Sequence, residues 1–302
     1  MRACGVLGFW LAALLAVPLA AAEAESNFGR VILARSDLIV LGVASAERKR
    51  MNTLTRVELT LEQTLHGKTD AREVSVYYSD PALLQADVAV RALFALKAMA
   101  EGGYEVVGKP VLVAPGDAEE NDKLLVTREF VALEAQKAGD ERTRAFWDLI
   151  VGHLRLGGYA AQNAVVELMF VARDRAGIIG EAEFERVRAA RDEATARHTR
   201  QTKDDLRLAL QGMVEARVKH LKYRAISREE DAKAKRAAAE GLKDLQREFP
   251  RAFTEEDAKL CDAHAADAKE EKLKALLTEL AETIRVDVRL YKAEKPGEGA
   301  GK

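Results

Sequence analysis

Two stretches decide the fold of the N-terminal part of the chain: DLIVLGVA at residues 37–44 and TRVELTLE at residues 55–62. The second stretch alternates polar and apolar side chains, and this period of two predicts a half-buried β-strand. The first is a continuous apolar run rich in β-branched residues, which also predicts a strand. Gly42 in its middle predicts a bulge or sharp bend. A polar loop is expected between the two strands.

The strand-rich pattern continues to about residue 107. Further strands are predicted at residues 74–78, 88–99 and 104–107, the last one after a Gly-Gly turn. Asp80 followed by Pro81 predicts the start of a short helix, with Asp as the N-cap. Three strands, a short helix and two more strands follow the order of the five-stranded OB-type barrel. The alternative is another small β-barrel or a β-sandwich.

The two opening strands and the turn after them carry a family resemblance. Residues 37–44 resemble a "D-hydrophobic-V-x-G-x-V" strand, and the second strand ends in His66-Gly67 where Lys-Gly is usual. This pattern is similar to an exported bacterial domain of the netrin-like or tissue-inhibitor-of-metalloproteinase-like type. The resemblance covers residues 27–108 and implies an OB-type barrel. The eukaryotic inhibitors insert an N-terminal cysteine into a protease metal site, and this chain has no cysteine there.

From about residue 117 the apolar period changes to 3.6, which predicts helices. Asp117 and Glu120 are spaced as in a capping box at the first of them. Two helices joined at Gly157-Gly158 predict a helical hairpin, and residues 156–168 resemble a HEAT-like repeat. The predicted fold is therefore α+β and multi-domain. Its parts are an OB-like barrel at residues 27–116, a helical-hairpin region at 117–292 and a flexible tail at 293–302.

Two later helix starts are predicted from spacing alone. Ile226-Ser227 followed by Glu230 has the pattern of a hydrophobic staple with a capping box. Phe253-Thr254 followed by Asp257 has the same pattern. The mixed charges at residues 186–203 and 229–243 are typical of solvated helix faces.

The first 22 residues have the order of a secretory signal peptide. One positive charge precedes an uncharged apolar run at residues 5–17, and small residues follow Pro18. The A-x-A rule places cleavage after Ala22 or Ala24, and an uncleaved membrane anchor is the alternative. Cleavage would remove Cys4, and no later run is long and apolar enough to span a membrane. An exported chain without a disulfide or a glycosylation site fits a bacterial cell envelope, with a periplasmic or extracellular location.

Composition excludes several classes of protein. The chain has 302 residues, of which 48% are hydrophobic, so it can bury a core. The formal charge is −2, with −3 in residues 27–135 and +2 in residues 136–302, so no strongly basic nucleic-acid footprint is present. The candidate interaction site is the basic loop of Arg48, Lys49 and Arg50, whose alternative is an ordinary solvated loop.

The sequence carries no recognisable catalytic motif. It has no G-x-S-x-G elbow, no phosphate loop and no G-x-G-x-x-G. Cys261 and His264 share one helical face and could form half of a metal site, but no second ligand cluster accompanies them. No catalytic, metal-binding or cofactor-binding residues are therefore predicted. Acidic pairs such as Glu119-Glu120 and Glu255-Glu256 are expected to cap helices.

These observations predict an exported, non-catalytic binding or scaffold protein. Its partner would be a protein or a glycan of the cell envelope, with no nucleic acid involved. The runner-up is a peptidase inhibitor or an accessory subunit of an envelope enzyme, acting through the N-terminal edge of the barrel. The third hypothesis is an enzyme whose residues no motif reveals.

Overall fold

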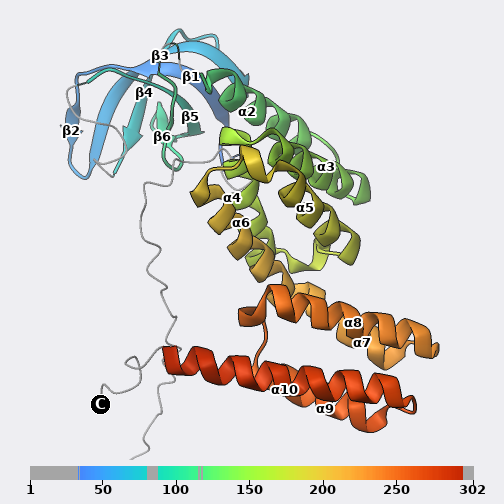
Figure 1. The fold of residues 1–302 in the computed structure, drawn as a ribbon. Helices are drawn as coiled ribbons and strands as arrows, with labels where there is room; N and C mark the ends of the chain where they lie inside the picture. The colour runs from blue at the N-terminus through green and yellow to red at the C-terminus, as the bar shows by residue number, and fades with distance from the viewer. Residues whose placement is uncertain (1–32, 34, 80–87, 115, 117, 295–302) are drawn as a thin grey trace, which may run out of the picture.

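The computed structural model describes residues 33, 35–79, 88–114, 116 and 118–294. Within this part, β-strands come first and helices follow, as the sequence predicts (Figure 1). The predicted signal peptide and the predicted helix start at Asp80-Pro81 lie outside the described residues. No helix of the described part is long and apolar enough to cross a membrane.

Five strands close into a barrel. Strand β1 pairs antiparallel with both β3 and β5, β3 pairs with β4, and β6 joins β4 in parallel and β5 antiparallel. This confirms the OB-like order, including closure between the first and fourth long strands. The strands are β1 (Leu38–Ala44), β2 (Lys49–Met51), β3 (Leu54–His66), β4 (Glu73–Tyr78), β5 (Val90–Ala98), β6 (Tyr104–Val106) and β7 (Val111–Leu112).

Strand β1 is apolar throughout because both of its faces are covered. Leu38 and Val40 belong to the core inside the barrel, whereas Ile39 and Leu41 belong to the core shared with the helices. The pairing of β1 with β3 shifts register beside Gly42, which confirms the predicted irregularity. A Cβ at this glycine would lie 2.7 Å from the carbonyl oxygen of Thr60, so the strands approach too closely there for any side chain.

The helical region begins with α2, which covers the outer face of the barrel (Figure 1). Its first residue is Glu120, and the residue before it makes no side-chain capping bond, while Asp117 lies outside the described residues. The α-helices are α2 (Glu120–Glu134), α3 (Asp140–Leu156), α4 (Gly158–Asp174), α5 (Glu181–Ala194), α6 (Arg200–Met213), α7 (Lys219–Arg228), α8 (Ala232–Glu248), α9 (Glu255–Asp267) and α10 (Glu271–Glu294).

Helices α3 to α6 form what we call the first stack. Asp148 of α3 pairs with Arg186 of α5, and seven residues later Arg155 pairs with Glu193. In each pair the two residues are 38 positions apart in the sequence, so α3 and α5 run parallel. Helices α4 and α6 also meet, since a Cβ at Gly212 would lie 3.4 Å from that of Ala172. The helical hairpin α3–α4 therefore stacks on the pair α5–α6.

Helices α7 to α10 form the second stack, in which α7 and α9 keep the same spacing. Lys219 of α7 binds Asp257 of α9, and Tyr223 contacts Cys261, again 38 residues apart. On the other side, Lys243 of α8 binds Glu279 of α10. The hairpins α7–α8 and α9–α10 thus stack in parallel, as the two pairs of the first stack do. Helix α10 runs to Glu294, so the predicted tail from residue 293 begins inside this helix.

Candidate functional site

The predicted basic loop is largely a strand. Lys49 and Arg50 lie in β2, which pairs with β3 through Arg56 and Thr55. The loop prediction was wrong for these two residues, because pairing across a tight hairpin turn orders the segment. Their side chains are nevertheless exposed. Only Arg48 of the predicted site lies outside a strand.

Arg48 has a structural role in the barrel. Its guanidinium group donates a hydrogen bond to the carbonyl oxygen of Val88 at 3.0 Å. It also lies against Tyr78, whose pKa is raised by burial and lowered in part by this cation. Nearby, Arg56 is bound by Glu58, which also accepts a hydrogen bond from Ser75. The three predicted residues therefore do not converge on one anion-binding site.

The interior of the barrel is filled by its own side chains. Val40, Leu59, Val76 and Phe94 are all fully buried in a single apolar core. A lipocalin-like barrel leaves a ligand cavity, whereas a small barrel packed with large side chains does not. A bound ligand inside the barrel is therefore not supported by the described residues.

A buried ion pair joins α7 to α9. The Lys219 ammonium group donates to Asp257 Oδ2 at 2.8 Å and to the carbonyl oxygen of Ala252 at 2.8 Å. The same carboxylate accepts hydrogen bonds from the amide and the hydroxyl of Thr254, which closes the predicted capping box. Each charged group is thus both paired and hydrogen-bonded, as burial requires. This arrangement holds two helices together and leaves no ammonium or carboxylate directed at a cavity.

Cys261 lies one turn further along the same interface. Its thiol is fully buried at 3.6 Å from the Tyr223 hydroxyl, and the His264 ring stacks on the Tyr223 ring. Burial raises the pKa of Cys261 to about 11 and lowers the pKa of His264. Among the described residues, no group of three or more His, Cys, Asp or Glu side chains could hold a metal ion. A thiol held protonated in this way is a packing group at neutral pH.

The raised pKa of Cys261 predicts a loss of stability in alkali. The thiol ionises near pH 9 in the unfolded chain and near pH 11 in the folded chain. The buried neutral thiol therefore keeps its full contribution to the free energy of unfolding below pH 9, and this contribution is lost as the pH rises through 11. The free energy of unfolding should fall by up to about 1.4 kcal/mol per pH unit in this window. Urea unfolding at several pH values checks this. A Cys261→Ala variant should show a shallower slope, and an equal slope would refute the assignment.

An open groove lies between α4, α6 and the π-helical segment η4 (Val214–Val218). Its volume is about 420 Å³. Small residues form part of its lining, and Leu208 lies on it with 58% of its surface exposed. Leu208 lies between the buried residues Leu206 and Leu210 of α6 but is itself exposed, and an apolar residue at this position was the one signal in the sequence for this surface. Its lining includes Met169, Ala172, Arg173, Leu208, Gly212 and Glu215.

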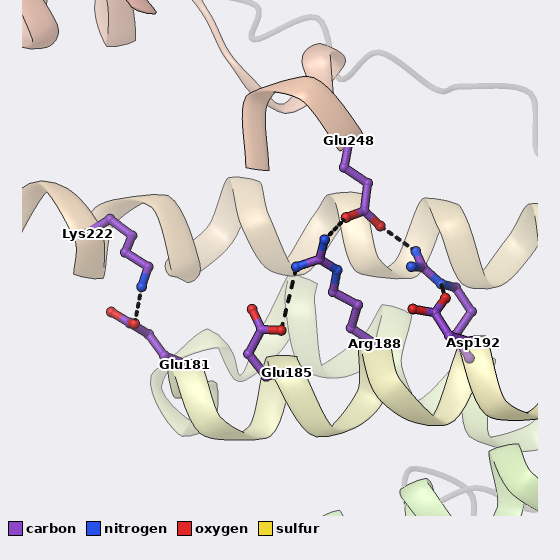
Figure 2. A network of polar contacts seen from close by, with 7 residues as sticks. Glu181, Glu185, Arg188, Asp192, Lys222 and Glu248 are labelled. Atoms are coloured by element: carbon purple, nitrogen blue, oxygen red, sulfur yellow. Dashed lines mark hydrogen bonds and ion pairs between the residues drawn. The ribbon is translucent and has the colours of Figure 1, made fainter. Parts of the chain in front are cut away.

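A network of ion pairs joins α5 to the second stack (Figure 2). Glu248 at the end of α8 forms ion pairs with Arg188 and Arg191, with N···O distances of 2.5 Å and 2.6 Å. Each arginine contacts a different carboxylate oxygen. Lys222 of α7 pairs with Glu181 at the start of α5. The sequence predicted a solvated face for residues 186–203, and the two arginines are only partly exposed because they pair with Glu248. Their partner lies 57 residues or more away, a distance at which local spacing carries no information.

Comparison with known proteins adds no assignment. No protein-family model matches the chain, and no curated protein matches it. The groove, the ion-pair network and the buried pair therefore carry the functional argument by their geometry.

Proposed function

We propose that this chain is a non-catalytic scaffold protein that binds a protein partner through its helical region. The filled barrel and the helical hairpins stacked at a spacing of 38 residues support this proposal. Stacked helical hairpins present extended surfaces that proteins use for binding. The spacing also supports a HEAT-like assignment of the helices, and the strand order supports a netrin-like one for the barrel. We further propose, from the signal-like N-terminus, that the chain acts in a bacterial cell envelope.

The groove between α4 and α6 is the observation that carries the proposal. Its apolar lining suits the side chains of a protein better than the hydroxyl-covered surface of a glycan. Arg173, which also pairs with Asp174, and Glu215 lie on different helical segments around the groove, so its edge carries both a basic and an acidic side chain. The occupant that fits is an amphipathic helix with two apolar side chains one turn apart, flanked by an acidic and a basic residue. Helices of this kind bind grooves through residues at i and i+3 or i+4.

A Leu208→Glu variant is expected to lose the partner. The substitution places a charge on an apolar groove, where an unpaired carboxylate is costly on binding. Capture of the partner from native envelope extracts should fall by about tenfold or more, which corresponds to about 1.4 kcal/mol. Leu208 is largely exposed, so the melting temperature should stay unchanged.

Leu260→Glu is the matched control, because Leu260 is 43% exposed on α9 and lies outside the groove. This variant should retain the partner at the wild-type level. Equal capture by the wild type and both variants would exclude the groove as the binding surface. Equal loss in both variants would indicate a general effect of the added charge.

A further inference from the structure

The regular stacking of the helices is interrupted between α5 and α7. Within the stacks, contacts between α3 and α5 and between α7 and α9 recur along the length of parallel helices, 38 residues apart. Across the junction, contacts of α5 are made with Lys222 of α7 and with Glu248 and Phe249 at the end of α8. In Figure 1 the helices of the second stack run in a different direction from α4 and α6. The two stacks therefore meet at a small junction, through which one buried core continues.

The chain crosses this junction as one helix that changes its winding. Helix α6 continues through the π-helical segment η4 into α7, from Arg200 to Arg228. A π-helical turn inside an α-helix is rare, occurs often at functional sites and is an established cause of bending. The buried core runs through this segment, since Val214 and Val218 belong to the same cluster as the buried residues of both stacks. The π-helical segment η4 thus lies where the direction of the helices changes.

The junction has an apolar centre and a charged edge. The Phe184 and Phe249 rings meet edge to face with their centroids 6.2 Å apart, and both residues are buried. Beside them, Glu248 is shared by Arg188 and Arg191, whose side chains keep 31% and 22% exposure (Figure 2). Glu248 is thus the one carboxylate that neutralises both arginines across the junction. Removing its charge leaves Arg188 and Arg191 paired only with Glu185 and Asp192 of their own helix, so the ion pairs between these arginines and α8 are lost.

We propose that this junction is a latched hinge, in which the second stack pivots on η4 and Glu248 is the latch. In the closed form described here, Glu248 and the two phenylalanines fix the angle between the stacks. The latch is partly exposed, so salt screens it and loosens it. Because Glu215 and Ala216 of η4 also line the groove, the pivot changes the shape of the groove. The hinge itself does not depend on the proposed partner binding.

The test measures the distance between the stacks by electron–electron double resonance in the full chain. Spin labels are placed at the exposed positions Arg144 of α3 and Glu282 of α10. Cys4→Ser removes one native thiol, and the buried Cys261 stays unlabelled. The wild type in low salt should give one narrow distribution of distances between the two spin labels. Glu248→Gln should convert an open population of below about 10% into a major one, and about 1 M salt should act in the same direction on the wild type.

Two controls separate a hinge from local unfolding. Glu279→Gln removes the ion pair with Lys243 inside the second stack and should leave the distribution narrow. Labels at Arg224 and Glu282, both in the second stack, should keep their distance in Glu248→Gln. An unchanged distribution between the stacks in Glu248→Gln and in high salt would overturn the hinge. Broadening within the second stack would also overturn it, because the stack would then not move as a unit.

Discussion

Asp257→Ala should lower the free energy of unfolding by about 3–5 kcal/mol. This substitution leaves the Lys219 ammonium group, whose side chain is only 7% exposed, without its counter-charge. It also removes the acceptor for the amide and the hydroxyl of Thr254. One change thus breaks both the link between α7 and α9 and the N-terminal cap of α9. Urea unfolding of the full chain measures the loss.

A second variant separates the two contributions. Lys219→Met with Asp257→Ala removes both charges, so it should recover part of the stability lost in Asp257→Ala alone. The matched control is Glu256→Ala, which removes a first-turn carboxylate of α9 and a largely exposed ion pair with Lys259 and should cost no more than about 1 kcal/mol. If Asp257→Ala behaved like Glu256→Ala, the buried pair would not hold the second stack together.

Phe94→Ala should cost about 3–5 kcal/mol, because it removes a large side chain from a close-packed interior. Phe94 is fully buried inside the barrel, in one core with Val40, Leu59 and Val76. The substitution removes apolar contacts and leaves a cavity that the closed barrel cannot collapse to fill. Chemical denaturation followed by circular dichroism gives the change in free energy.

Leu112→Ala is the control for the barrel, since Leu112 lies on β7 and is 57% exposed. Its effect should be small. A cost of less than about 1 kcal/mol for Phe94→Ala would mean that the interior is loosely filled. In that case a barrel that holds a ligand would again be a reasonable model.

Much of the barrel could be predicted because its strands obey simple patterns. The alternation from Arg56 to Glu62 reflects one face inside the barrel and one in water. The apolar run of β1 did not reveal that one face of this strand packs against the helices. Ile39 and Leu41 point away from the barrel into the core shared with the helices, and that arrangement depends on residues far along the chain.

The two capping boxes predicted for the later helices had different outcomes. Thr254 and Asp257 form the expected reciprocal bonds at the start of α9. Ser227 does not start a helix, because it lies inside α7 and its hydroxyl donates to the carbonyl oxygen of Tyr223. Helix α8 starts instead at Ala232, where the Asp231 side chain accepts from the backbone. Spacing alone does not distinguish a cap from a serine that bonds back within a helix.

The candidate sites were harder to predict than the fold. The loop of Arg48, Lys49 and Arg50 was chosen by charge, but strand pairing and the bond from Arg48 to Val88 dominate there. The groove and the junction bring together residues of different helices. The repeated spacing of 38 residues shows in contacts between helices, whereas the residues in contact differ from one stack to the other. A single sequence does not reveal such a repeat.

Photo-crosslinking from position 208 tests the central claim most directly. A photoreactive phenylalanine analogue replaces Leu208 in the full chain, and a second chain carries it at Leu260 outside the groove. Irradiation of living cells should give one discrete adduct with a second protein from position 208 and none from position 260. The absence of an adduct at 208, or the same adducts at both positions, would contradict a protein-binding groove between α4 and α6.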